Sequence, residues 1–256
     1  MRATYLSHSF SRHTHESFAI GVIVAGAEAF RCSGSLHIAP LGSIIVVNPA
    51  ELHTGHSANP SGWSYRMLYP KVELLQQAAS EIANKSKPVP YFRTPVIQDR
   101  QLAKCMSRLH ADLETSNSTL EKDSCLLALL TQLVARHAID RPAPSSLGRE
   151  NRSINSVRDY LDAHYADDIS LKILSSVANL SPFYLVRAFH AQVGLPPHAY
   201  LTQVRVRRAK DLLALGLAIS QVALLTGFVD QSHLTQHFKR AVGVPPGHYA
   251  KGVYAA

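Results

Sequence analysis

The chain has 256 residues, 46% of them hydrophobic and 17% charged, which is long enough for two cores and too apolar for a disordered protein. Its formal net charge of +8 favours polyanionic partners without requiring them. Three cysteines, none in a C-x-x-C pair, argue against a disulfide framework. The N-terminus has no signal-peptide core, and the apolar run 18–30 is too short to span a bilayer. We therefore expect a soluble cytoplasmic protein with no membrane partner.

The first 70 residues have the pattern of short strands. β-Branched residues cluster in "GSIIVVNP", where Pro49 ends the run, and in "WSYRMLY" every second residue from Trp63 to Tyr69 is aromatic or methionine. Gly34 and Gly42 stand where turns would fall. Several short strands in succession predict a small barrel or sandwich.

After Pro70 the pattern becomes helical. Apolar residues recur at helical spacing in two stretches around 102–109 and 126–133, with the polar segment "ETSNST" between them. These stretches predict a helical hairpin, which serves either as a dimer contact or as a buried internal pair. The segment "DRPAPSSLGREN", residues 140–151, has no apolar periodicity and is typical of a linker.

One segment occurs twice. "LVRAFHAQVGLPPHAY", residues 185–200, returns as "LTQHFKRAVGVPPGHY" at 234–249, with seven identities in sixteen positions. In the first copy Ser181 is a favoured N-cap, and Gly194 followed by two prolines ends the helix. In the second copy Asp230 and Gly243 take these roles. Each copy therefore predicts a short helix with a marked start and end.

A second short helical pattern precedes each copy. It is "SLKILSSVANL" in the first case and "ISQVALLTGF" in the second, with Asn179 and Gly227 at the turn, and both residue types tolerate left-handed geometry. Helix, tight turn, helix, occurring twice, predicts two helix-turn-helix units. The segment 200–216 joins them as a connecting helix that ends at Gly216.

Two interpretations of this repeat compete: a bundle packed for stability, or two units whose second helices enter the DNA major groove. Neither face expected to be exposed carries a carboxylate, and the second offers donors suited to base edges and phosphates, which favours DNA. The side chains expected to point outward are Phe183, Val186, Arg187 and His190 in the first copy and Ser232, Thr235, Gln236 and Lys239 in the second.

Residues 154–249 resemble the DNA-binding domain of the AraC/XylS family of bacterial transcription regulators. The resemblance rests on "LSPFYLVRAF", "RRAKDLLALG" and "VALLTGFVDQSHLTQHFKRAVGVPPGHY" with their spacing. It implies that Lys239 and Arg240 meet phosphates. Ala250 departs from the arginine usual in the family, which would remove one contact to the DNA backbone. The base-facing residues that the resemblance implies are Phe183, Val186, Arg187, Gln231, Ser232, Thr235 and Gln236.

The N-terminal half resembles the cupin-type sensor domain common in this family. The strings that carry the resemblance are "RHTHESFAIGVIVAG", "LGSIIVVNPAELHTGH" and "GWSYRMLYP". They imply a small β-barrel whose mouth holds an effector. The candidate ligand-binding residues are His13, His15, Glu51 and His53.

An H-x-H pair with a later histidine can also form a metal site. Enzymatic cupins place a glutamate a few residues after the pair, and here those positions hold Ala19 and Ile20. We therefore expect histidines that contact ligand or make structural hydrogen bonds, with no metal, no other cofactor and no catalytic residues. A metal-dependent sensor, a sensor that has lost its ligand and, less favoured, a cupin enzyme fused to a DNA-binding domain remain as alternatives.

The sequence thus predicts an α+β two-domain protein. A cupin-like sensor occupies 1–139, with its barrel at about 1–70 and its helices at about 71–139. A linker follows at 140–151, and an all-α DNA-binding domain with two helix-turn-helix units occupies 152–256. The predicted function is that of a one-component transcription regulator, an activator by resemblance, gated by a small molecule. Its expected partners are promoter DNA, the effector and RNA polymerase, with a homodimer as one option.

Overall fold

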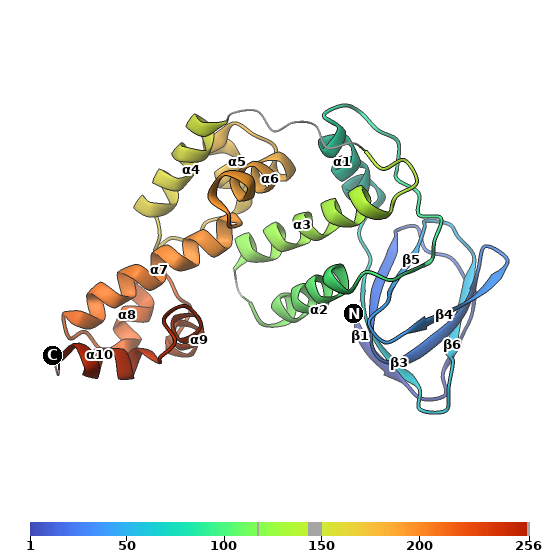
Figure 1. The fold of residues 1–256 in the computed structure, drawn as a ribbon, viewed down its shortest axis with the longest axis horizontal. Helices are drawn as coiled ribbons and strands as arrows, with labels where there is room; N and C mark the ends of the chain where they lie inside the picture. Colours follow the sequence, from blue (N-terminus) through green and yellow to red (C-terminus); the bar gives the residue numbers. More distant parts are fainter. Residues whose placement is uncertain (117, 143–149, 255–256) are drawn as a thin grey trace. The chain divides into compact units, whose positions relative to one another are not determined.

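The computed structural model describes residues 1–116, 118–142 and 150–254, and the chain divides into two compact units (Figure 1). The first comprises Met1–Thr115 and Cys125–Ser146, and the second Ser116–Ser124 and Leu147–Ala256. The predicted α+β class is confirmed, because the strands lie in the first unit and the second is helical. The linker expected at 140–151 lies mostly outside the described residues, and its last residue begins a helix.

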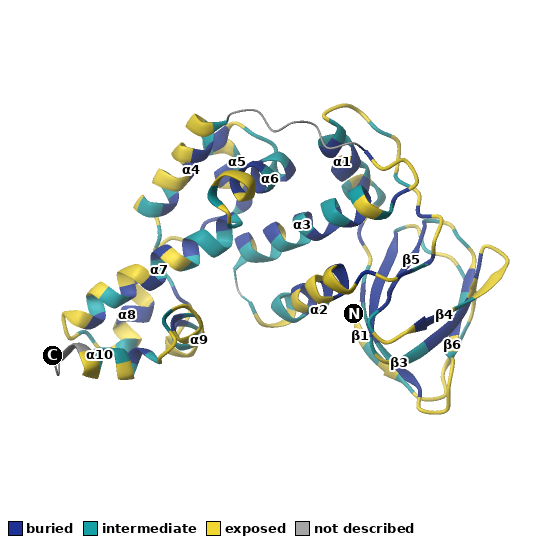
Figure 2. Ribbon diagram, in the orientation of Figure 1, coloured by how far each residue is buried: buried dark blue, intermediate teal, exposed yellow. Residues whose placement is uncertain are grey.

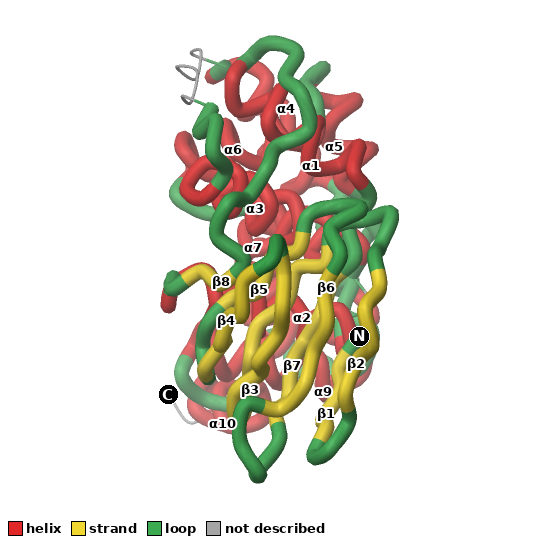
Figure 3. Tube along the Cα trace, turned by 90° about the vertical axis from the view of Figure 1, so that its right-hand side faces the viewer, coloured by secondary structure: helices red, strands yellow, loops and turns green. Residues whose placement is uncertain are grey.

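The strands of the first unit form two sheets that share the long strand β3 (Figure 3). Each pairing between them is antiparallel, and β3 pairs with β5 and β7 through its first half and with β4 and β6 through its second. One sheet has the order β1 (Arg2–Tyr5), β7 (Trp63–Leu68), β3 (Ala19–Cys32), β5 (Ile44–Val47), β8 (Val96–Ile97). The other contains β2 (Ser9–His13), β6 (His53–Ser57), β3 and β4 (Ser35–Pro40).

Strand β3 passes from one sheet to the other at a bulge. The register with β7 shifts between Ile23 and Ala25, and Gly26 follows with φ of 65°. A Cβ atom at Gly26 would overlap the carbonyl oxygen of Gly62. Only glycine fits this position, which combines a left-handed backbone with close contact to another chain segment. The bulge lets one strand contribute to both walls of the barrel.

Three helices accompany the sheets: α1 (Val72–Ala83), α2 (Arg100–Thr115) and α3 (Thr119–His137). The predicted helical hairpin is confirmed (Figure 1). Asp99 caps α2 by accepting from the backbone N–H of Leu102 at 3.0 Å. Its other oxygen lies 2.9 Å from Nε2 of His137 and 3.0 Å from Nη2 of Arg136. The end of α3 is thereby tied to the start of α2.

The second unit consists of helices, with no strand among its described residues. Besides the first residues of α3, they are α4 (Asn151–Ala163), α5 (Leu171–Ala178), α6 (Pro182–Val193), α7 (Pro197–Ala214), α8 (Ile219–Leu225), α9 (Gln231–Val242) and α10 (Pro246–Tyr254). Two helix-turn-helix units, α5–α6 and α8–α9, are joined by α7, as predicted (Figure 1). Within the part of the chain that the structure describes, no helix is both long and apolar enough to cross a membrane.

Both turns have the backbone that their residues predicted. Asn179 adopts φ of 52° and Gly227 φ of 75°, which is the left-handed region. Ser181 accepts a hydrogen bond from the N–H of Tyr184 at 3.3 Å and so caps α6. Gly194 and Gly243 end α6 and α9 in left-handed geometry. Helix α10 was not predicted, because Pro245 and Pro246 were interpreted only as the end of α9, whereas Pro246 is the first residue of α10.

Candidate functional site

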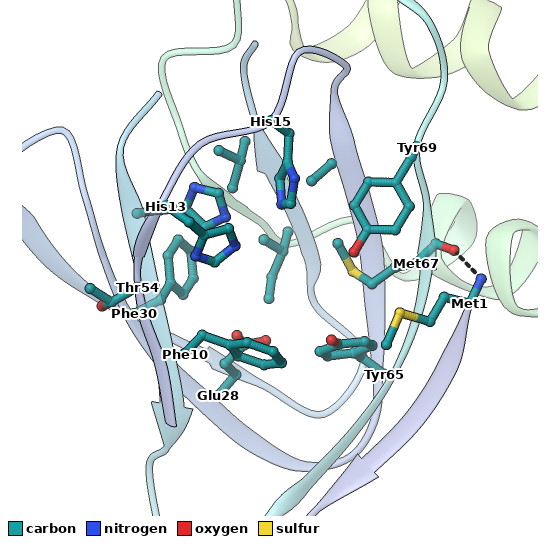
Figure 4. A pocket seen from close by; sticks show the side chains of 14 residues that line it. Met1, Phe10, His13, His15, Glu28, Phe30, Thr54, Tyr65, Met67 and Tyr69 are labelled. Carbon is teal, nitrogen blue, oxygen red and sulfur yellow. Dashed lines mark hydrogen bonds between the residues drawn. The ribbon is translucent and has the colours of Figure 1, made fainter. Parts of the chain in front are cut away.

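A cavity of about 170 Å³ lies between the two sheets (Figure 4). Three strands each turn two alternate residues into it, because residues two apart share one face of a strand. Those pairs are 28 and 30 on β3, 45 and 47 on β5, and 65 and 67 on β7. The lining residues are Met1, Phe10, His13, His15, Ala19, Glu28, Phe30, Ile45, Val47, His53, Thr54, Tyr65, Met67 and Tyr69. The wall is mainly aromatic and aliphatic, with a few ionisable groups.

The three histidines expected at the barrel mouth come together. His13 and His53 are directly opposite each other on β2 and β6, and their ring centroids lie 4.3 Å apart. The ring of His15 lies 4.9 Å from that of His13 and 5.1 Å from that of His53. Burial lowers the pKa of both His15 and His53, and the neighbouring His13 lowers it further. Both are therefore neutral near pH 7.

Glu51, the fourth residue expected to bind ligand, is not among the residues that line the cavity. Its carboxylate accepts from Ser33 Oγ at 2.7 Å and from the Tyr91 hydroxyl at 2.8 Å. Asn48 adds donors from its side chain at 3.0 Å and its backbone at 3.2 Å. Burial acts to raise the pKa of Glu51, but these hydrogen bonds outweigh it and the pKa is lowered. The residue stabilises the turn before β6, and its backbone carbonyl faces Nδ1 of His53.

Glu28, which the sequence analysis did not propose for the site, lines the cavity across from His13 and His15 (Figure 4). Burial raises its pKa to about 8, so the carboxyl group is mostly neutral at pH 7 and can donate a hydrogen bond. Gly55 makes room for it, since a Cβ there would lie 2.7 Å from Glu28 Oε1. A carboxylate inside the apolar run 18–30 was the available signal.

Tyr65 and Tyr69 are two further groups that the sequence analysis did not propose. Burial raises the pKa of both phenols, so both remain hydrogen-bond donors at any physiological pH. Figure 4 shows Tyr69 on the side of His15 and Tyr65 beside Glu28. Their alternation along "WSYRMLY" predicted a half-buried strand but not that its buried face would line a cavity.

In the second unit, α9 presents a polar face without carboxylates. Asp230 caps the helix by accepting from the N–H of His233 at 2.8 Å, while Leu234 and Phe238 are fully buried. Thr235 is partly exposed, and its hydroxyl donates to the Gln231 carbonyl at 2.7 Å. The exposed members of the predicted set are Gln231, Ser232, Gln236, Lys239 and Arg240. Their donors suit base edges and phosphates.

Helix α6 differs from the prediction. Phe183 and Val186, expected to point outward, are only 2% and 4% exposed. Figure 2 shows buried residues along α6. The prediction took only Leu185 and Phe189 as the buried face of α6, and this face is wider than those two residues. Val186 is only about 60° from Phe189 around the helix, so it falls within a wide apolar face. The exposed-face prediction is therefore wrong for these two residues, whereas Arg187 is partly exposed and His190 exposed.

Helix α7 packs against both α6 and α9. Its 18 residues span about 27 Å at 1.5 Å per residue. Phe189 of α6 packs edge-on against Tyr200 near the start of α7, with ring centroids 5.7 Å apart. At the other end, Leu213 of α7 shares a buried cluster with Leu234 and Phe238 of α9. These two contacts lie 13 residues apart along α7, or about 20 Å at the same rise.

Comparisons with known proteins match both units. The AraC-like ligand binding domain matches residues 1–130, and a helix-turn-helix domain matches residues 174–252. The uncharacterised HTH-type transcriptional regulator YbfI of Bacillus subtilis (strain 168) is 31% identical over 229 residues, which cover 90% of this chain and 82% of YbfI. The HTH-type transcriptional activator RhaS of Enterobacter sp. (strain 638) is 25% identical over 156 residues, 60% of this chain and 54% of RhaS.

Among solved structures, one similar chain is the C-terminal domain of AraT, a response regulator from Geobacillus stearothermophilus. It is 29% identical and covers 42% of this chain and 88% of its own length, with a TM-score of 0.38. A crystal structure of ToxT in its apo form, from Vibrio cholerae strain SCE256, covers 98% of this chain and 96% of its own length, at 11% identity and a TM-score of 0.41.

Proposed function

This chain belongs to the AraC family of transcriptional regulators, and we propose that a small molecule bound between its two sheets controls how its helical unit binds promoter DNA. The chain is a DNA-binding transcription regulator with an N-terminal ligand-binding domain. The observation that carries the proposal is the cavity in that domain, which combines apolar walls with buried ionisable groups. Such a combination is typical of small-molecule sites.

The lining of the cavity suggests the chemical class of the effector. A volume of about 170 Å³ fits a compact molecule, because an apolar cavity of roughly 150 Å³ holds one benzene. Phe10, Phe30, Tyr65 and Tyr69 favour a flat or apolar body. The histidines and the neutral carboxyl group of Glu28 favour polar groups at two ends of it. We propose a small, partly apolar metabolite with oxygen-containing groups.

The effector acts only if it binds two states of the regulator with different affinity. We propose that the bound form favours the arrangement that binds promoter DNA, so that the protein activates transcription. The relative RhaS carries the name of an activator, which supports this choice. RNA polymerase and a second copy of the chain are proposed as further partners, the cytoplasm as the place of action, and no enzymatic step is invoked.

A thermal-shift screen of small metabolites against the full-length protein tests the effector site. Ala19→Leu would fill the cavity, since Ala19 lines it. Ala25→Leu is the matched control on the same strand, because Ala25 is exposed and does not line the cavity. A true effector raises the melting temperature of the wild type and of Ala25→Leu but not of Ala19→Leu. Equal shifts in all three proteins would place the ligand elsewhere.

A further inference from the structure

We propose that His13, His15 and His53 together bind one divalent transition-metal ion of the Zn²⁺ class, and that one coordination position of this ion faces the cavity, open to an oxygen donor of the effector. This inference deepens the proposed effector site and rests on it for the identity of the last ligand. Binding of the metal itself does not depend on DNA binding and is measured separately.

The first observation that supports a metal site is that the three histidine rings converge. The three residues each offer a ring nitrogen, and these atoms lie within 4.8 Å of one another. Around a tetrahedral ion with bonds of about 2.0–2.1 Å, two nitrogens lie about 3.4 Å apart. The rings therefore have to close in by about 1–1.5 Å, which rotation of side chains on a fixed backbone can supply. His13 and His15 are only partly buried, so their rings have room to turn.

The second support is the orientation of the rings. Nδ1 of His13 lies 2.8 Å from the carbonyl oxygen of Ser11, and Nδ1 of His53 lies 3.0 Å from the carbonyl oxygen of Glu51. A carbonyl oxygen can only accept, so Nδ1 is the protonated nitrogen in both rings. With Nδ1 donating, Nε2 of each ring is the nitrogen available to bind a metal. Histidines that ligate metals are typically held in this way by a backbone carbonyl.

The third support is a rigid frame. His13 and His53 are cross-strand partners that end β2 and begin β6. The carbonyl oxygen of His15 accepts a hydrogen bond from the N–H of Ala50 at 2.8 Å, which ties the segment after β2 to the turn before β6. All three backbone positions are therefore fixed by pairing, and a metal would find its ligands on preformed positions.

The three imidazole nitrogens indicate which ions the site would bind and which kind of fourth ligand would complete it. Imidazole nitrogens suit Zn²⁺, Cu²⁺, Fe²⁺ and Ni²⁺, and three of them leave a tetrahedral site incomplete. The three-histidine group found among the described residues includes no carboxylate, because Glu28 lies across the cavity from it, so its neutral ligands would not balance the charge of the ion. A carboxylate or another anionic oxygen on the effector would complete the coordination and balance this charge.

Metal binding is tested on the full-length protein without a polyhistidine tag, after chelator treatment and dialysis. Isothermal titration with Zn²⁺ is expected to give one ion per chain, and Zn²⁺ should raise the melting temperature. His53→Gln and His15→Gln should each weaken binding at least about tenfold. His56→Gln is the matched control, because His56 lies on β6 but is exposed and outside the cavity. It should bind as the wild type does.

Titration with Co²⁺ tests the open position, because the visible absorption of this ion reports its coordination. Addition of azide should change the spectrum in the wild type, and an unchanged spectrum would mean that the position is closed. Wild-type protein that binds no ion, or equal losses in His15→Gln and His56→Gln, would overturn the site. If metal binding fails while specific DNA binding persists, only this inference is lost; the reverse result would reject the regulator function alone.

Discussion

The two helix-turn-helix units share the same structural residues. In each, a serine or aspartate caps the second helix, a left-handed glycine ends it, and the Phe and Tyr of the repeated segment pack edge-on. Phe189 and Tyr200 have ring centroids 5.7 Å apart at 74°, and Phe238 and Tyr249 have theirs 5.4 Å apart at 65°. The residues repeated in sequence are therefore those that build the scaffold.

The faces of the two second helices differ. Phe183 and Val186 of α6 are buried, whereas the corresponding residues of α9, Ser232 and Thr235, are exposed and partly exposed. Helix α9 thus has the longer exposed polar face, whereas of the residues proposed on α6 only Arg187 and His190 are at least partly exposed. The internal repeat therefore maintains a common fold, while each copy has its own surface.

Replacing the left-handed residue of a turn with alanine should cost more stability at Gly227 than at Asn179. At Gly227, φ is 75° and a Cβ would lie 2.6 Å from the carbonyl oxygen of Ala166, so Gly227→Ala combines backbone strain with a backbone clash. We expect it to lower the free energy of unfolding by about 3 kcal/mol or more. Asn179→Ala, at the matching position, should cost only about 1–2 kcal/mol. Urea denaturation of both variants measures this difference in unfolding free energy. Equal losses of stability in the two variants would refute the prediction.

The next effect concerns α9, whose exposed polar face is proposed to bind DNA. Gln236→Ala removes an exposed side chain from α9 and should weaken binding to a preferred site by roughly 1–3 kcal/mol while relaxing specificity at one base pair. Lys239→Ala should weaken binding to all sequences and reduce its salt dependence. Fluorescence anisotropy with substituted sites measures both. Uniform weakening by Gln236→Ala would contradict its role in reading bases.

Lowering the pH should destabilise the second helix-turn-helix unit more than the first. Burial, followed by the nearby His233, lowers the pKa of His237 to about 4, while the first unit has Ala188 at this position. A lowered pKa in the folded state means that stability is complete above about pH 6.5 and is lost as pH falls toward 4. We expect a loss of about 1–2 kcal/mol, discounted for partial exposure. His237→Ala should flatten this part of the unfolding profile; an unchanged slope would assign it to other groups.

The smallest predicted loss of stability follows from removing the side chains that cap α6 and α9. Ser181→Ala and Asp230→Ala should each cost about 1 kcal/mol of unfolding free energy. The aspartate should cost slightly more, because its charged acceptor makes the shorter bond, 2.8 Å against 3.3 Å. Thermal unfolding of the full-length variants gives the comparison. A larger loss for the serine would show that hydrogen-bond length does not rank these caps.

Local chemistry made much of the second unit predictable. Ser181, Asp230 and the glycine after each second helix mark the ends of helices by their own hydrogen bonds and backbone preferences, so their roles follow from sequence. Burial at Val186 and Phe183 depends on how wide the apolar face is, which a two-residue stripe does not reveal. Pro246 begins α10 by the rule that places proline in a first turn, although it was interpreted only as the end of α9.

The barrel was less predictable, because its cavity arises from strands distant in sequence. The three histidines were proposed as a group from the H-x-H pattern and a later histidine, and pairing of β2 with β6 brings them together. Glu28 was not proposed for the site, since its burial depends on the bulge that carries β3 into both sheets. The two-residue strand β8 lies in a segment predicted as helical, and it is too short to have a detectable period.

The most direct test is a DNA-binding titration of the full-length protein on its neighbouring promoter region, with and without the compound found by thermal shift. We predict a sequence-specific complex whose dissociation constant changes with the compound in the wild type and in Ala25→Leu but stays constant in Ala19→Leu. A protein that forms no specific complex in either state, or a response that survives in Ala19→Leu, would contradict control of DNA binding by a ligand between the sheets.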